Sequence, residues 1–299
     1  MKKILVFGPS RTVETLTVPT LLSATEGISY ESTLGGQGET VAVALARLGA
    51  RSVFSGRVGD DSGGKRLVRL LDVAGVDLSC FRVDRNAQTG HLVTECDGQG
   101  SRSLLFPGAD AGLSEEDVRA AFLTAPEAVC VAGALSPLLL ALIASLAEER
   151  AIPVFMLYTG AAPIGALPRL HVFVTDEATA AALSGVVPSG ADNALKAVIA
   201  MQKTVQADYY IIRQGDRGAF LYDGTYCHLV SSFILPKTDD RGADEVFFAA
   251  AVCEYLTAGG ELQLALRYAA AAAALASARR GIAESAPTAD EVMAFLERS

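Results

Sequence analysis

The segment Arg241-Gly242-Ala243-Asp244 combines a glycine turn with a carboxylate, directly before the apolar run 246–251. A glycine-containing turn that opens a helix presents unpaired backbone N–H groups and the positive end of the helix dipole, which together bind anions such as phosphate. A carboxylate beside such a site can accept the proton of an attacking hydroxyl group. The segment therefore predicts either phosphoryl transfer with Asp244 as base, or a simple helix start that Asp244 caps.

A second glycine-rich segment, Gly35-Gly36-Gln37-Gly38, precedes an expected helix that stops near Gly49. Glycines before a helix let the backbone approach a ligand closely, and the alternative is a tight strand-to-helix turn. The segment lacks the Gly-x-Gly-x-x-Gly fingerprint of dinucleotide binding, and no Gly-Lys-Ser/Thr follows as in a P-loop. A nicotinamide-dependent oxidoreductase is therefore disfavoured.

The elements that must position these residues alternate along the chain between short β-rich runs and helical patterns. Expected strands cover residues 4–7, 128–131, 154–157, 172–174 and 209–212, and expected helices include residues 138–147 and 193–201. This alternation predicts a three-layer αβα, Rossmann-like fold with a mostly parallel central sheet. Ligands of such folds bind at the carboxyl ends of the strands.

Two regions, residues 12–34 and 89–107, alternate polar and apolar residues without helix signals. We expect both to form antiparallel strands of a small β lid, inserted into a single domain that spans residues 1–299. Exposed edges of these strands can pair with a second copy of the chain. A homodimer through the lid strands is therefore expected.

Composition narrows the class of protein. The 299 residues are 51% hydrophobic and carry a net charge of −9, which supports a large core and argues against a nucleic-acid partner. Five scattered cysteines without a Cys-x-x-Cys pair fit reduced thiols in the cytoplasm. The apolar run at the N-terminus is too short for a signal peptide, and no apolar run has the length of a membrane span.

Several modest motifs occur in one specific order. They are Gly35-Gly36-Gln37-Gly38, Arg47-Leu48-Gly49-Ala50, Val58-Gly59-Asp60-Asp61, Ala74-Gly75-Val76-Asp77, Thr89-Gly90, Pro107-Gly108-Ala109, Arg213-Gln214-Gly215-Asp216-Arg217-Gly218 and Gly242-Ala243-Asp244. In this order the chain resembles, over nearly its whole length, the ribokinase (pfkB) family of carbohydrate kinases.

The resemblance implies ATP-dependent phosphorylation of a hydroxymethyl group on a sugar or sugar-like small molecule, with Mg²⁺ at the phosphates. It implies Asp244 as general base, with the N–H groups around Gly242 and Ala243 binding the transferring phosphoryl group and Arg241 beside them. The implied sugar-binding residues are Glu14, Gly35, Gly36, Gly38 and Thr40. The implied nucleotide-binding residues are Asp176, Arg213, Gly215 and Gly218.

The chain also departs from the family pattern at the expected site. Thr40 replaces an Asn, Thr12-Val13-Glu14 replaces Asn-x-Asp, and Asp176-Glu177-Ala178-Thr179 replaces Asn-x-x-Glu. Where the family has Gly-Ala-Gly-Asp, this chain has Arg241-Gly242-Ala243-Asp244. An alanine at position 243 would be strained if that position needed a positive φ. The family's residues for a monovalent cation correspond to Thr238 and Asp240. These changes keep open an alternative: a catalytically impaired relative that binds a polyhydroxylated ligand.

Overall fold

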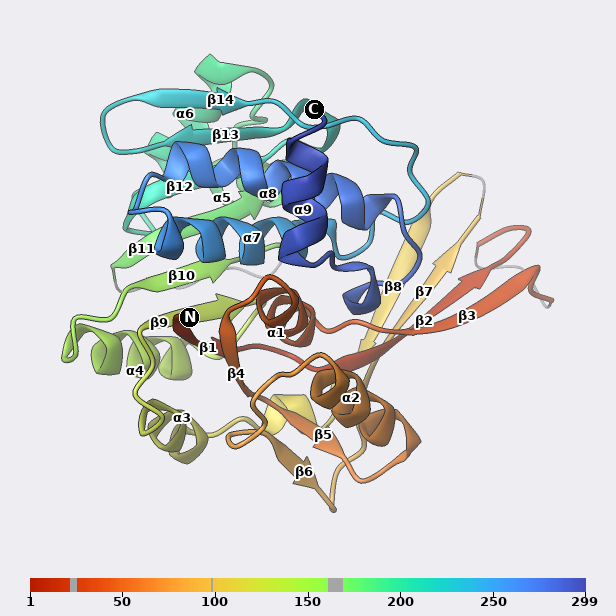
Figure 1. The fold of residues 1–299 in the computed structure, drawn as a ribbon. Coiled ribbons are helices and arrows are strands. Elements are labelled where there is room, and N and C mark those ends of the chain that lie inside the picture. Colours follow the sequence, from red (N-terminus) through yellow and green to blue (C-terminus); the bar gives the residue numbers. More distant parts are fainter. Residues whose placement is uncertain (22–25, 98, 161–168) are drawn as a thin grey trace.

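The computed structural model describes residues 1–21, 26–97, 99–160 and 169–299. Within these residues a large sheet lies at the centre of the molecule, and a smaller sheet projects from one side of it (Figure 1). The large sheet contains, in spatial order, β14 (Cys227–Val230), β13 (Ala219–Tyr222), β12 (Ala207–Arg213), β11 (Leu170–Asp176), β10 (Val154–Leu157), β9 (Ala128–Ala132), β1 (Lys3–Phe7) and β4 (Arg51–Ser55).

The large sheet is parallel from β12 to β4, and β13 and β14 add to it in antiparallel orientation. Its parallel strands are apolar on both faces, as expected when helices cover each side. The five strands expected from the sequence all belong to it. The prediction of a mostly parallel α/β fold is confirmed.

Helices cover both faces of the large sheet. One face packs against α1 (Gln37–Arg47), α7 (Ala243–Thr257) and α8 (Leu262–Ser277). The other face packs against α3 (Glu115–Phe122), α4 (Pro137–Glu148), α5 (Glu177–Ser184) and α6 (Ala191–Met201). The remaining α-helices are α2 (Ser62–Val73) beside the lid and α9 (Ala289–Leu296), which packs on α8. No helix in these described ranges is both long and apolar enough to cross a membrane.

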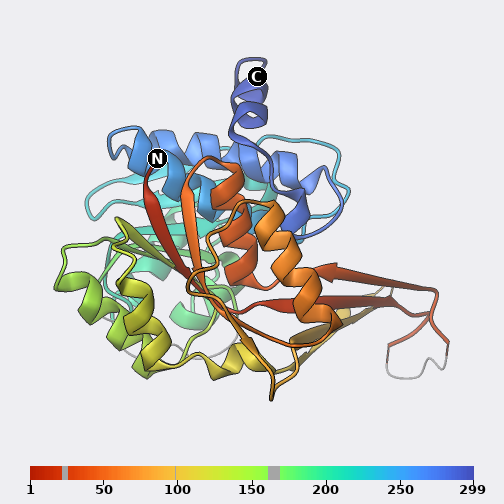
Figure 2. The same ribbon diagram turned by 60° about the horizontal axis from the view of Figure 1, so that its bottom comes forward.

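The smaller sheet, here called the β lid, contains β3 (Ser29–Leu34), β2 (Arg11–Thr17), β7 (Gly90–Cys96) and β8 (Ser101–Phe106), in that order. Figure 2 shows it extending away from the helices of the main body. The pairs β2–β3 and β7–β8 are antiparallel, whereas β2 and β7 pair in parallel. Our expectation of a purely antiparallel lid was therefore wrong at β2–β7, because these strands belong to segments separated by α1, β4 and α2, and the long connection permits a parallel pair.

Short elements complete the fold. Strands β5 (Arg57–Gly59) and β6 (Arg82–Asp84) form a two-stranded parallel pair. Helix α1 ends at Arg47, and Gly49 follows its C-cap with a φ of 89°, the left-handed conformation that suits a glycine at a helix stop. Helices α7 and α8 lie against one another, and the alanine-rich sequence of α8 permits this close approach. The start of α7 lies beside the carboxyl ends of β11 and β12.

Candidate active site

Two cavities meet at the segment that leads into α7. The small cavity, of about 380 Å³, lies between the ends of β11 and β12 and the start of α7. The large cavity, of about 860 Å³, lies between that same segment and the β lid. Lys237 and Asp240 line both cavities. A ligand in one cavity is therefore adjacent to a ligand in the other.

The turn before α7 places its one left-handed residue at Gly242, which has a φ of 80° and is the N-cap of the helix. Ala243 is the first helical residue, so the positive φ does not fall on an alanine. Among the described residues, the non-glycine residues with positive φ are Ala125 and Ala151. The glycine shift in Arg241-Gly242-Ala243-Asp244 therefore leaves the turn unstrained at position 243. The N–H group of Ala243 donates to the carbonyl oxygen of Asp240 at 3.3 Å, and the positive end of the helix dipole at this turn favours an anion.

Asp244 lies in the first turn of α7 and lines the small cavity. Its Oδ1 accepts a hydrogen bond from Nε of Arg213, at 3.0 Å. The guanidinium of Arg213 also lies 4.3 Å from the centre of the Phe247 ring, in cation–π geometry. The Arg213 side chain is 7% exposed and that of Asp244 is 35% exposed. The carboxylate is thus held from the buried side and open to the cavity on the other.

Arg213 also has a buried donor group, Nη1, without a partner among the described residues. An unpaired buried N–H of a charged group is costly, and a phosphate oxygen in the adjoining cavity would satisfy it. Arg213 therefore suits an anionic ligand in the small cavity.

The predicted nucleotide-binding residues divide between this cavity and its surroundings. Asp176, Arg213 and Gly215 line the small cavity, and Gly218 does not. Gly218 has a φ of 101°, and a Cβ atom there would lie 1.9 Å from the carbonyl oxygen of Val230. Gly218 therefore shapes the turn after β12, which is a structural requirement for glycine.

The predicted sugar-binding residues divide in the same way. Gly35 and Gly36 line the large cavity. Gly38 does not: a Cβ atom there would lie 2.6 Å from the backbone of Gly8, so it permits close packing of two chain segments. Thr40 is fully buried, and its hydroxyl donates to the carbonyl of Gly36. Thr40 therefore stabilises the glycine loop instead of facing the cavity.

Glu14 lies on the opposite face of the β lid from the large cavity. Strand β2 alternates, so Arg11, Val13 and Thr15 line the cavity whereas Glu14 points away from it. The Glu14 carboxylate accepts a hydrogen bond from Thr12, and it lies 3.6 Å from Nδ1 of His91. The period-two alternation of the strand was the sequence signal that could have selected Arg11, Val13 and Thr15.

Sequence reasoning also missed acidic residues of the large cavity, namely Asp239 and Glu245. Glu245 follows Asp244 in the first turn of α7. Burial, reinforced by the neighbouring charge of Asp244, raises the pKa of Glu245 from 4.5 to about 7. The large cavity thus contains a carboxyl group that titrates near neutral pH.

Glu39 is a further buried carboxyl group, in the first turn of α1. It accepts hydrogen bonds from Ser10 Oγ at 2.8 Å and from the N–H of Arg11 at 3.0 Å. Burial raises its pKa to about 8 despite these hydrogen bonds. Its first-turn position resembles an ordinary helix N-terminal acid, which is why the sequence alone did not single it out.

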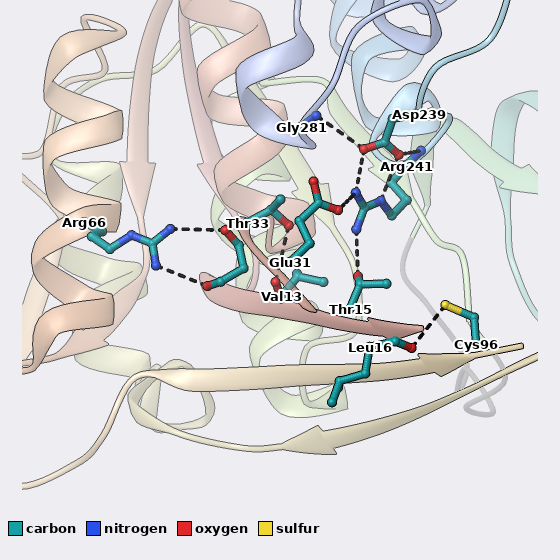
Figure 3. A network of polar contacts seen from close by, with 11 residues as sticks. Val13, Thr15, Leu16, Glu31, Thr33, Arg66, Cys96, Asp239, Arg241 and Gly281 are labelled. Carbon is teal, nitrogen blue, oxygen red and sulfur yellow. Dashed lines mark hydrogen bonds and ion pairs between the residues drawn. The ribbon is translucent and has the colours of Figure 1, made fainter. Parts of the chain in front are cut away.

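Arg241 points toward the β lid (Figure 3). Its guanidinium donates to Asp239, to Thr15 Oγ1 at 2.8 Å and to Glu31 Oε2 at 2.7 Å. Arg241 lines the large cavity, whereas Ala243 and Asp244 line the small one. The side chain therefore neither reaches nor blocks the small cavity in this structure.

The described residues contain no group of three His, Cys, Asp or Glu side chains arranged to hold a metal ion. Two carboxylates, Asp176 and Glu177, line the small cavity. Mg²⁺ that accompanies a nucleotide is commonly held by one or two carboxylates together with phosphate oxygens and water. These two residues fit that mode of binding.

A model of the pfkB family of carbohydrate kinases matches residues 1–289. Ribokinase from Haemophilus influenzae is 26% identical over 307 residues, covering 100% of this chain and 99% of that protein. ATP-dependent ribose-1-phosphate kinase from Halopiger xanaduensis is 31% identical over 268 residues, covering 88% of this chain and 86% of that protein.

The structure of Arabidopsis thaliana ribokinase complexed with ribose and ATP matches with a TM-score of 0.87 at 22% identity, covering 100% of this chain and 99% of that one. A putative ribokinase II from E. coli, in complex with ATP and Mg²⁺, matches with a TM-score of 0.83 at 18% identity, covering both chains completely.

The central sheet between two layers of helices, with its projecting lid, defines a ribokinase-like α/β protein. The chain belongs to the pfkB family of carbohydrate kinases, because the family model spans nearly all of it. It is thus a carbohydrate kinase by class, and its full-length relatives include a ribokinase and a ribose-1-phosphate kinase.

Proposed function

We propose that this protein transfers the γ-phosphoryl group of ATP to a hydroxymethyl group of a sugar or sugar-like alcohol, with Asp244 as general base. The observation that carries the proposal is the position of Asp244 at the start of α7: it lines the small cavity, and its neighbours Gly242 and Glu245 line the large one. The small cavity would hold the nucleotide and the large cavity the acceptor. The names of two relatives, a ribokinase and an ATP-dependent ribose-1-phosphate kinase, support this class of reaction for both a sugar and a sugar phosphate as acceptor.

The chemical step follows from these positions. The acceptor oxygen forms a bond to the γ-phosphorus while the bond between that phosphorus and the bridging oxygen of ADP breaks. The acceptor proton passes to Asp244, whose carboxylate Arg213 orients. The N–H groups at the start of α7 stabilise the charge on the transferring group. Bound Mg²⁺, held beside Asp176 and Glu177, would supply further neutralisation of the phosphates.

The acceptor would contact Gly35, Gly36 and the cavity face of β2. Both glycines line the large cavity. A Cβ atom at Gly36 would lie 2.3 Å from the carbonyl oxygen of Pro9, so this glycine also permits the close packing of two chain segments beside the cavity. The β lid covers the same cavity and would exclude water, which otherwise competes for the phosphoryl group. Thr238 and Asp240 correspond to the family's monovalent-cation residues, but Asp239 lies one residue from the expected place, so potassium activation is not carried over to this protein.

The test compares ATP turnover of the wild type and Asp244→Ala across a panel of sugars, nucleosides and sugar phosphates. Removing the base is expected to lower the rate by roughly 10² to 10⁴-fold. Asp72→Asn, at an exposed carboxylate on α2, is the matched control and should keep full activity. Acceptor-independent turnover alone, or full activity of Asp244→Ala, would refute the proposal.

The alternative is a family member that binds a polyhydroxylated ligand without efficient phosphoryl transfer. The altered residues at Thr12, Thr40, Thr179 and Arg241 motivate it. Thermal unfolding with and without ATP and Mg²⁺ separates the two, because a nucleotide that binds the native state raises the melting temperature at saturating concentration. Stabilisation by sugars but not by nucleotide would favour the alternative.

A further inference from the structure

We propose that Arg241 is a positioning residue that connects the β lid to the turn carrying Asp244. Four residues form this connection, here called the Arg241 cluster: Thr15 of β2, Glu31 of β3, Asp239 and Arg241 (Figure 3). The kinetic consequences of this inference rest on the proposed function. The connection itself does not, and it is tested separately below.

The turn side of the cluster is rigidly organised. The Asp239 carboxylate accepts from the backbone N–H of Arg241 at 3.1 Å, from its Nε at 2.8 Å and from its Nη2 at 2.6 Å. It also accepts from the backbone N–H of Gly281, at 3.3 Å, which joins the turn to the loop after α8. The guanidinium of Arg241 is therefore fixed relative to Gly242 and the start of α7.

The lid side adds one contact from each of two neighbouring strands. Thr15 Oγ1 and Glu31 Oε2 accept from different nitrogens of the same guanidinium. Thr15 and Glu31 are directly paired in the β2–β3 register, so both contacts fall at one level of the lid. The planar fork of arginine can satisfy three partners at fixed angles, which the point charge of lysine cannot.

The cluster lies at the large cavity, between the surface that would bind the acceptor and the proposed base. Arg241, Thr15 and Asp239 all line that cavity. Only two residues, Gly242 and Ala243, lie between Arg241 and Asp244, so a displacement of the lid at Thr15 or Glu31 is transmitted to the start of α7. Small errors in the placement of reacting groups cost large factors in rate.

A second lid contact offers a contrast. Arg66 of α2 donates to the side chain and backbone of Ser32 in β3. Figure 3 shows Arg66 on the side of the lid away from the turn. Within β7 and β8, Glu95 pairs with Arg102. Neither contact touches residues 237–244. Glu95→Gln is therefore the matched control for Glu31→Gln: each removes one lid carboxylate from an arginine, and only Glu31 belongs to the Arg241 cluster.

Hydrogen–deuterium exchange of the unliganded protein tests the connection without any assay of activity. Glu31→Gln and Thr15→Val are expected to raise exchange in β2, in β3 and in residues 237–243 by about two- to fivefold, as for loss of a partly exposed ion pair. Glu95→Gln should leave residues 237–243 unchanged. Equal exchange of residues 237–243 in Glu31→Gln and the wild type would overturn the inference.

Kinetics then tests its consequence in the active protein. In Glu31→Gln we expect kcat to fall about tenfold and acceptor-independent ATP hydrolysis to rise relative to transfer, with KM for ATP unchanged. Arg241→Lys should restore part of the kcat lost in Arg241→Gln. If Glu31→Gln retained wild-type kcat and hydrolysis, the positioning role would be refuted. A wild type without acceptor-dependent turnover would refute the proposed function, and the exchange result would still decide the connection.

Discussion

Arg213 Nε donates a hydrogen bond to Asp244 Oδ1 at 3.0 Å, which joins the end of β12 to the start of α7. The pair brings together two residues that are 31 positions apart in sequence. The Arg213 guanidinium also packs over the ring of Phe247, with Cζ 4.3 Å from the ring centre. Arg213 therefore holds the proposed base in place with Nε, and its buried Nη1 has no hydrogen-bond partner among the described residues.

Replacing Arg213 is expected to affect nucleotide binding and the chemical step together. Arg213→Lys keeps a positive charge but loses the second nitrogen, so we expect KM for ATP to rise and kcat to fall, with kcat/KM for ATP lower by roughly 10 to 100-fold. Steady-state kinetics with varied ATP measures both constants. Arg169→Lys, at an exposed arginine that pairs with Asp208 and lines neither cavity, is the control. An unchanged KM for ATP would contradict a phosphate contact.

Gly242→Ala should destabilise the protein more than Gly49→Ala. Gly242 and Gly49 have φ values of 80° and 89°. A Cβ atom at position 242 would lie 2.9 Å from Cγ2 of Ile282, whereas one at position 49 meets nothing within 4 Å. Backbone strain alone costs about 1 to 2 kcal/mol, and the contact with Ile282 adds to it.

Urea unfolding of Gly242→Ala and Gly49→Ala separates the two contributions, because only strain is present at position 49. Equal losses in the free energy of unfolding would show that the contact with Ile282 relaxes without cost.

The order of motifs predicted the fold closely because buried strands and glycine turns are local signals. The strands at residues 4–7 and 154–157 are apolar on both faces, and Gly49 terminates its helix as expected. The parallel pairing of β2 with β7 was not predictable, since nothing local in either strand specifies the direction of a distant partner.

The site was less predictable because its geometry depends on which face a side chain occupies. The predicted Glu14 points away from the large cavity, and its neighbours on β2 line it instead. Asp244 carries a local signal in its turn, whereas its partner Arg213 comes from a distant strand end. Arg241 and Glu31 are 210 positions apart in the sequence, so no local pattern of residues could predict their contact.

Glu39 should make the stability of the protein depend on pH. Burial raises its pKa in the folded state from 4.5 to about 8. The folded state therefore binds more protons than the unfolded state between these values. The stabilisation from the protonated group is complete below about pH 4.5 and is lost as the pH rises through 8, by an amount on the order of a few kcal/mol.

In the Glu39→Gln variant the buried group cannot ionise. The free energy of unfolding of this variant should therefore fall less than that of the wild type between pH 5 and 8. Urea unfolding at several pH values in this range measures the difference. Parallel pH dependence of the two proteins would contradict the assignment.

Glu245 should produce a titration in the acceptor kinetics. Its pKa is raised to about 7, and it lines the large cavity. Its ionised carboxylate accepts stronger hydrogen bonds from sugar hydroxyl groups than the protonated form does, so KM for the acceptor should fall as the pH rises through 7. The wild type should show this step in a pH profile of kcat/KM for the acceptor, and Glu245→Gln should lack it. A step of the same size in both proteins would assign the titration to another group.

The outer strand of the lid is expected to pair with a second copy of the chain. Strand β8 is an edge strand exposed along its whole length, and Leu104, Leu105 and Phe106 are 47%, 48% and 52% exposed. An unpaired edge with exposed apolar side chains favours strand association, and a lysine there opposes it.

Light scattering of the wild type should give twice the chain mass of 31.1 kDa. Leu105→Lys should lower it toward the monomer, whereas Leu123→Lys, at an 82% exposed residue outside the lid, should not. A monomeric wild type would exclude this association.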